Sequence, residues 1–178
     1  MKETALKIRI IGDEVLTKKA KAIKEVTDYH REILSAMARL MYESSGVGLA
    51  APQVGISGQM VVIDVGRGLY KLINAKIVKK HGSQVMEEGC LSVPGIGIRI
   101  KRAKKIWLEA LDENGKPVKI EAEDLFARAC QHELDHLCGK LIVDYASLID
   151  KIKIKKRLKN LKQNLSNCAC TYSPCPRR

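Results

Sequence analysis

The segment EDLFARACQHELDHLC, from Glu123 to Cys138, restricts the fold more than any other stretch of the sequence. Apolar residues recur in it every three or four positions and Gly139 follows as a helix C-cap, so the segment is predicted to form one helix. A helix with this many apolar residues is usually buried. The sequence therefore predicts a central helix that takes histidine and glutamate side chains into the protein interior.

His132, Glu133 and His136 on this helix form the His-Glu-x-x-His pattern of metallohydrolases. Residues four apart share a helix face, so the two imidazoles can hold one divalent metal between them. Glu133 would then reach a water bound to that metal. The alternative is a pair of core histidines bonded to backbone carbonyls, which would leave the buried Glu133 unexplained.

A catalytic metal site needs a third protein ligand and one open position. Cys130 and Cys138 each stand two residues from a histidine, about 200° around a helix, so they are predicted to point away and to be small buried residues. Cys90 is the better candidate, because it lies at a predicted strand break where its thiolate could point inward. Three further cysteines lie in the polar C-terminal segment, at Cys168, Cys170 and Cys175.

The remaining segments indicate a mixed fold. Residues 28–43 are predicted to form a helix, and the glycine-containing segment 46–53 a loop. Five segments are predicted strands and one more a long helix: 60–65, 70–78, 84–93 with an interruption at Gly89, 98–112, 118–121, and the helix 145–164. Helices at both ends with strand pairs between them predict the α+β class, with antiparallel sheets packed around a central metal-binding helix and a C-terminal helix.

Charge is concentrated at one end of the chain. Residues 151–178 contain nine Lys and Arg residues and no Asp or Glu, so they hold nine of the twelve net positive charges of the 178-residue protein. Such a segment is typical of proteins that meet nucleic acid or an acidic surface, or it is only a solvated helix face. We expect a single catalytic domain over 1–165 and a short, mobile, basic tail with cysteines over 166–178.

Two features that the sequence lacks bear on where in the cell the protein is expected. No run approaches the length of about 20 apolar residues that spans a membrane. The N-terminus lacks the apolar core of a signal peptide. A cytoplasmic protein with reduced thiols and no membrane partner is therefore expected.

Three motifs together resemble one family. The segments GVGLAAPQ (46–53), EGCLS (88–92) and QHELDH (131–136) occur in the order and spacing of peptide deformylases, which remove the N-terminal formyl group from new bacterial and organellar chains. The resemblance extends over about residues 5–165. Two positions depart from it: Glu14 replaces the family's usual proline, and Gly97 stands where some members carry an arginine near the substrate.

The resemblance implies a metal site and a mechanism. Cys90, His132 and His136 would bind one divalent metal, with water in the fourth position. The family favours Fe²⁺, and Zn²⁺ or Ni²⁺ are alternatives because a thiolate and two imidazoles accept several first-row ions. Glu133 would be the general base. Three groups would stabilise the oxyanion, namely the metal, the Leu91 backbone N–H and the Gln53 side-chain amide.

The resemblance also implies how substrate binds. The main chain of a formyl-methionyl nascent peptide would pair with Val47, Gly48 and Gly89 like an added strand. The methionine side chain would enter an apolar pocket, lined by Val47, Met86, Phe126, Ala129 and Cys130. Glu88 and Arg102 would hold the metal ligands in position without binding the metal themselves.

Two other functions remain open at this point. One is a metallopeptidase that cleaves internal peptide bonds with the same helix. The other is an RNA- or ribosome-binding module with a structural metal, which the basic C-terminus favours. For an enzyme of the deformylase type, that basic helix would meet the ribosome surface.

Overall fold

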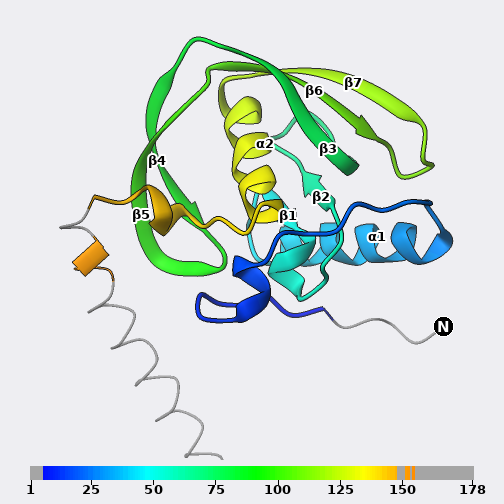
Figure 1. The fold of residues 1–178 in the computed structure, drawn as a ribbon, viewed down its shortest axis with the longest axis horizontal. Helices are drawn as coiled ribbons and strands as arrows, with labels where there is room; N and C mark the ends of the chain where they lie inside the picture. The colour runs from blue at the N-terminus through cyan, green and yellow to red at the C-terminus, as the bar shows by residue number, and fades with distance from the viewer. Residues whose placement is uncertain (1–5, 148–150, 153, 155–178) are drawn as a thin grey trace, which may run out of the picture.

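The computed structural model describes residues 6–147 together with residues 151, 152 and 154. Two α-helices are described in full, α1 (Asp28–Glu43) and α2 (Asp124–Leu137). Three short 3₁₀ turns accompany them, η1 (Glu14–Thr17), η2 (Ala51–Val54) and η3 (Ile142–Tyr145). Figure 1 shows α2 at the centre of the molecule, with strands around it and α1 across one end.

The strands form two antiparallel sheets. Their bounds are β1 (Gly48–Ala50), β2 (Met60–Ile63), β3 (Tyr70–His81), β4 (Gln84–Cys90), β5 (Val93–Arg102), β6 (Lys105–Leu111) and β7 (Pro117–Glu123). One sheet has the order β1-β2-β3-β6-β7, and the other is the pair β4-β5. Among the described strands, β1 and β4 each have a neighbour on one edge only. The α+β class predicted from the sequence is confirmed.

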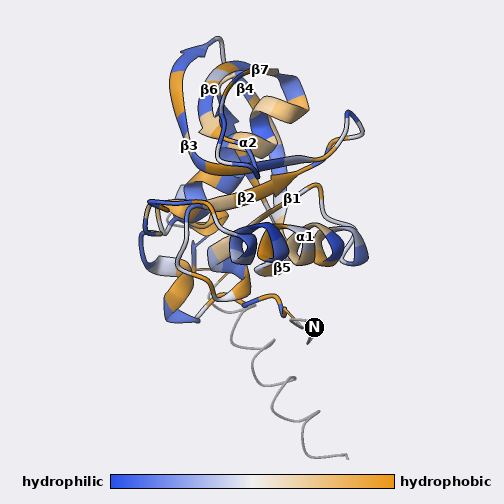
Figure 2. Ribbon diagram, turned by 90° about the vertical axis from the view of Figure 1, so that its right-hand side faces the viewer, coloured by the Kyte–Doolittle hydropathy of each residue, from blue (hydrophilic) through white to orange (hydrophobic). Residues whose placement is uncertain are grey.

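Apolar periodicity explains how the helices pack. On α1 the buried residues recur three or four apart, at Ile33, Met37 and Met41, and they join Leu49 and Val62 in one core cluster. Figure 2 shows hydrophobic and hydrophilic residues alternating along this helix, as expected for one buried face. Helix α2 packs against β1, β2 and β7. Its residues therefore lie inside the protein on most sides.

Several predicted boundaries need correction. The segment 98–112 was predicted as one strand, but it divides at Ala103–Lys104 between β5 and β6. The segment 46–53, predicted as a loop, contains β1 and the turn η2. Burial alternates along β5 and places Ile98, Ile100 and Arg102 on the inner face.

The C-terminal helix is described only in part. Lys151, Ile152 and Ile154 are helical, and Ile154 packs against a core cluster that contains Leu16 and Val93. Tyr145, the predicted first residue, belongs to the turn η3 instead. Most of the predicted helix and the whole of the basic tail 166–178 lie outside the described residues. In the described part of the chain, no helix is long and apolar enough to cross a membrane.

Candidate metal centre and active site

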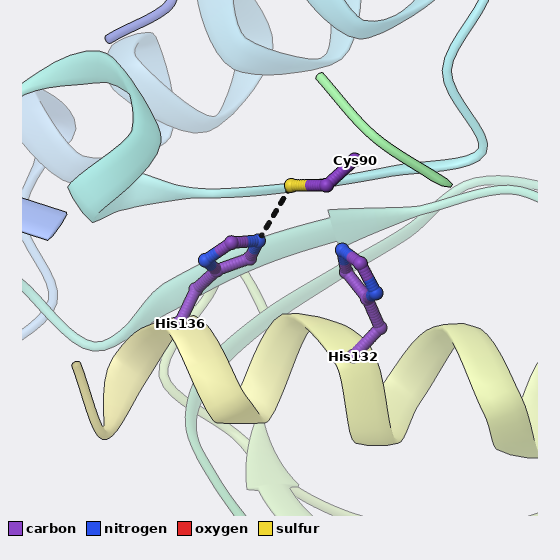
Figure 3. Close-up of side chains that lie close together, drawn as sticks. All are labelled: Cys90, His132 and His136. Carbon is purple, nitrogen blue, oxygen red and sulfur yellow. Dashed lines mark hydrogen bonds between the residues drawn. The ribbon is translucent and has the colours of Figure 1, made fainter. Parts of the chain in front are cut away.

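Cys90, His132 and His136 meet at one point, although Cys90 lies 42 positions before His132 in the sequence. Cys90 is the last residue of β4, and the two histidines lie one turn apart on α2 (Figure 3). One donor atom from each residue lies within 4.8 Å of the others, and Cys90 Sγ is 3.3 Å from His136 Nε2. A thiolate and two imidazoles at this spacing can share one divalent ion.

Unpartnered buried atoms lie in the same place. Glu133 Oε2 and His136 Nδ1 are buried and have no hydrogen-bond partner among the residues that the structure describes. Buried polar groups are nearly always satisfied by protein, water or an ion. The unpartnered Glu133 Oε2 therefore fits a site that holds a polar molecule such as water, whereas His136 faces Cys90 with its other ring nitrogen, Nε2.

The pKa shifts of the two histidines also fit a cation site. Burial acts to lower the pKa of His132, but contacts with Cys90 and Glu88 outweigh it and raise this pKa to about 10. The surroundings thus stabilise positive charge at this imidazole, which a metal ion would supply in place of the proton. Burial, with the charges of His132 and Arg102, lowers the pKa of His136 well below its ordinary value, so this ring is neutral and able to coordinate.

Glu133 lies beside the three donors and is only 4% exposed. Burial raises the pKa of its carboxyl to about 7. A carboxylate with a pKa near neutrality is suited to take up and release a proton. Gly48 on β1 provides the space for it, because a Cβ at that position would overlap the Glu133 carboxylate.

Glu88 contacts helix α2 through the side chain of His132. Its Oε2 lies 3.0 Å from His132 Nδ1, and Arg102 donates from Nε to Oε1 at 2.6 Å and from Nη2 to Oε2 at 2.9 Å. Burial would raise the pKa of Glu88, but hydrogen bonds with His132 and Arg102 outweigh it and lower this pKa to about 2. The ionised carboxylate accepts from His132 Nδ1–H, which leaves Nε2 as the ring nitrogen that a metal would bind in place of a proton.

Two further groups extend this network. Arg128 Nη1 donates to Glu88 Oε1 at 2.5 Å and to the Ile100 carbonyl at 3.1 Å. Arg102 Nη1 donates to Asp135 at 2.7 Å. Sequence reasoning missed Arg128. Its signal was present, since it lies four residues before His132 and thus on the same side of a buried helix.

Gln53 reaches the site from the turn η2. Its Oε1 accepts a hydrogen bond from the Ala50 backbone N–H at 2.8 Å, which turns the amide NH₂ toward the donors. Nε2 then lies 3.6 Å from Cys90 Sγ and 3.2 Å from Ser92 Oγ. Leu91 follows Cys90 directly and lines the same cavity. An oriented amide donor thus faces the metal ligands.

A cavity of about 530 Å³ opens beside the metal centre. Its wall includes most of the residues predicted to bind substrate, namely Val47, Gly48, Met86, Gly89 and Ala129. Leu125 and Arg128 of α2 also line it. The cavity therefore joins the free edges of β1 and β4 to the candidate metal ligands.

The predicted burial of Cys130 is confirmed, but the pocket assignments of Phe126 and Cys130 and the predicted burial of Cys138 differ from the structure. Phe126 and Cys130 lie in the core, 4% and 1% exposed, and they are not among the cavity-lining residues. The ring of Phe126 packs against Tyr70, with centroids 4.6 Å apart. Cys138 is exposed, not buried as predicted, because it caps the end of α2.

Comparisons with known proteins agree with this geometry. Residues 5–152 match the family model described as "Polypeptide deformylase". The chain is 53% identical over 139 residues to the peptide deformylase of Thermoanaerobacter pseudethanolicus, a match that covers 78% of this chain and 87% of that protein. It is 43% identical over 158 residues to that of Acetivibrio thermocellus, covering 88% and 93%.

Solved structures give the same result. The peptide deformylase of Legionella pneumophila superposes with a TM-score of 0.86 at 38% identity, covering 95% of this chain and 99% of that one. The peptide deformylase of Synechococcus elongatus, solved in complex with actinonin, gives 0.81 at 37% identity, covering 90% and 87%. The chain therefore belongs to the peptide deformylase family, metal-dependent hydrolases that remove the N-terminal formyl group from nascent polypeptides.

Proposed function

We propose that deformylation takes place at the cavity beside Cys90, His132 and His136, with these three residues holding one divalent metal. The observation that carries the proposal is the convergence of three donor atoms within 4.8 Å, next to a buried carboxylate that lacks a partner. By family resemblance we favour Fe²⁺ as the native ion, with Zn²⁺ or Ni²⁺ as substitutes. A bound divalent metal supplies Lewis acidity, which polarises a carbonyl and lowers the pKa of water.

Glu133 is the proton-transfer group of this proposal. It accepts a proton from the water that attacks the formyl carbon. The C–N bond of the formamide then breaks, and Glu133 delivers the proton to the departing amine, so the products are formate and a free N-terminus. A pKa raised to about 7 supports both roles, because the carboxyl can then lose and regain a proton at neutral pH.

Two donors stabilise the negative charge that develops on the formyl oxygen. The Gln53 NH₂ group is held in place by the bond from the Ala50 N–H to its carbonyl oxygen. The Leu91 backbone N–H is the second donor. One such donor is typically worth about 10²–10³ in rate.

Substrate binds as an added strand in this proposal. The edges of β1 and β4 that face the cavity carry Gly48 and Gly89. Backbone groups of Val47, Gly48 and Gly89 would pair with the peptide main chain. The methionine side chain would lie against Met86, Ala129 and Leu125, while Phe126 and Cys130 support that wall from the core.

The setting of the reaction is also part of the proposal. Residues 1–165 form the catalytic domain, and the basic segment 151–178 brings it to ribosomal RNA, where nascent chains emerge in the cytoplasm. The support is the charge distribution, because nine cationic side chains without an acid favour binding to phosphate.

Release of formate from formyl-Met-Ala-Ser tests the assignment. We expect hydrolysis by the metal-loaded protein and loss of both metal and activity in Cys90→Ala. The matched control is Cys138→Ala, an exposed cysteine that caps the C-terminal end of α2. Cleavage of internal bonds in a blocked peptide would instead favour the general metallopeptidase, and four protein ligands to the metal would favour a structural site.

A further inference from the structure

A second cavity, of about 510 Å³, lies against a different face of helix α2 from the cavity beside the metal centre. The two cavities share no lining residue. A set of α2 residues at intervals of three or four lines each of them, with Leu125, Arg128, Ala129 and His132 in the first cavity and Gln131, Leu134, Asp135 and Cys138 in the second. Residues at these intervals share one helix face, so the second cavity is separate from the one that would take the substrate.

The second cavity differs from the first in the sign of its charge. Three glutamates line the first cavity, together with one arginine and His132. The charged residues of the second are four cations and one acid, namely Lys76, Lys80, Lys101, Arg102 and Asp135. The second cavity therefore favours a negatively charged ligand.

Two of these lysines have no acidic partner to offset their charge. The side chains of Lys80 and Lys101 are exposed, and neither forms an ion pair within the part of the chain that the structure describes. Lys76, by contrast, pairs with Glu109 at 3.1 Å. In the register of β3 and β6, Lys80 stands opposite Ile106, which is buried in the core cluster beneath α2. Residues directly opposite share one face of a sheet, so Lys80 projects from the face that α2 covers.

The rest of the wall is ordered and partly apolar. The carboxylate of Asp135 is held by Arg102 Nη1 at 2.7 Å and by the Tyr145 hydroxyl at 2.9 Å. Leu134 and Leu137 of α2 add apolar surface to the same wall. Apolar surface with a few fixed polar groups is typical of small-molecule sites, and their volumes are about 300–1,000 Å³.

We propose that the second cavity binds a phosphorylated small molecule with an apolar portion, of about the size of a mononucleotide. A phosphate monoester carries about −1.5 to −2 charges at neutral pH, which complements Lys80 and Lys101. The C-terminal segment 151–178 does not supply such a charge, because it contains no Asp or Glu. A concave site of this volume also suits a small molecule better than a nucleic-acid strand, which follows an extended groove.

The test measures binding by titration calorimetry, with AMP as the probe and adenosine as its uncharged counterpart. Each exposed lysine that pairs with the phosphate should contribute roughly a two- to fivefold gain in affinity. The metal-loaded, full-length protein should thus bind AMP at least about fourfold more tightly than adenosine at low salt. The difference should shrink as ionic strength rises, because salt screens exposed charges.

Variants of the lysines locate the charge that AMP meets. The double variant Lys80→Gln/Lys101→Gln should bring the affinity for AMP close to that for adenosine. Lys79→Gln is the matched control, because Lys79 is the neighbour of Lys80 on β3 but lies over the Trp107 ring, 4.7 Å from its centroid, outside the cavity. It should bind AMP as the wild type does.

Cys138 reports whether AMP lies in the second cavity, because it is exposed and belongs to the wall. Bound AMP should slow the alkylation of Cys138 by iodoacetamide in the wild type and in Lys79→Gln, as measured by mass spectrometry. The same concentration of AMP should give no such protection in the double variant.

Equal affinity for AMP and adenosine would overturn the inference, and so would binding of AMP that leaves the alkylation of Cys138 unchanged. Protection of Cys138 by a five-nucleotide RNA but not by AMP would also contradict it, and would assign the cavity to RNA instead. None of these measurements uses formate release, so the inference and the proposed function stand or fail separately.

Discussion

The Glu133 carboxylate occupies the space that a side chain at Gly48 would need. The backbone of a glycine of β1 therefore packs against the carboxylate of a glutamate of α2, next to the three proposed metal ligands. The absence of a side chain at Gly48 allows the proposed base to reach its position. This contact links the first motif of the sequence, at 46–53, to the third, at 131–136.

Gly48→Ala should lower kcat strongly while the protein keeps its metal. The new methyl group must displace Glu133, and misplacement of a catalytic group by about 1 Å can cost about 10²-fold in rate. Formate release and metal content measure the two effects. Gly58→Ala is the control, because a Cβ there meets only ordinary contacts at 3.5 Å or more. Full activity in Gly48→Ala would show that the position of Glu133 is not critical.

Glu133→Gln should retain the metal and lose turnover by about 10²–10⁴-fold. The amide keeps the size of the side chain but cannot accept and return the proton. Metal analysis of the purified variant, with kcat/KM on a formyl-methionyl peptide, separates a base from a ligand. Loss of the metal from Glu133→Gln would argue for coordination by this residue instead.

Removal of the metal should inactivate the enzyme and lower its melting temperature. A ligand that binds only the folded state adds to the free energy of unfolding, so its loss destabilises the protein. Treatment with a chelator followed by Fe²⁺, Ni²⁺ or Zn²⁺, without oxygen, measures the recovery of activity with each ion. His136→Ala should show no such recovery, since one of three proposed ligands is missing.

Arg102→Met should destabilise the fold by up to about 3–5 kcal/mol, because it removes one of the two arginines that pair with the buried Glu88 and the arginine that pairs with the half-buried Asp135. It should also weaken metal binding by about 10–100-fold, since Glu88 no longer holds His132 firmly. Lys76→Met is the comparison. Its pair with Glu109 is exposed to solvent and should contribute little to the free energy of unfolding. Denaturant unfolding of both variants gives the free energies.

Truncation after Ile154 should leave peptide hydrolysis intact and abolish salt-sensitive binding to ribosomes. Ile154 packs against the core and is retained, while seven of the nine basic residues of 151–178 are removed. Co-sedimentation with ribosomes at low and high salt measures the binding. If full-length and truncated proteins sediment equally, the basic segment is only a solvated surface.

The structural features that depend on local periodicity and short motifs were the ones predicted best from the sequence. The bounds of α1 at Asp28 and Glu43 agree with the prediction, because apolar spacing and the glycines after it both mark its end. The convergence of Cys90 with the two histidines was also expected. That convergence was predicted from three motifs in the order of one family, because the helix pattern alone does not indicate a partner for the histidines.

The cavity wall was harder to predict. Every residue from Phe126 to Gln131 is buried, because α2 is surrounded on most sides. Periodicity then cannot say which buried residues face a cavity and which face the core, so Phe126 and Cys130 were assigned to the pocket. The strand β1 was missed for another reason: its pairing with β2 is made by backbone groups, and Gly48-Leu49-Ala50 has no alternating pattern to reveal it.

The unpaired edges of β1 and β4 on either side of the cavity limit the time during which a nascent chain can be deformylated. Only a chain without secondary structure can lie between them, so a folded N-terminus presents no backbone to pair with. In the proposed mode of binding, the enzyme competes with the folding of its own product. Rapidly folding proteins would leave a brief interval for processing, and formyl groups should persist on those whose first residues become buried earliest.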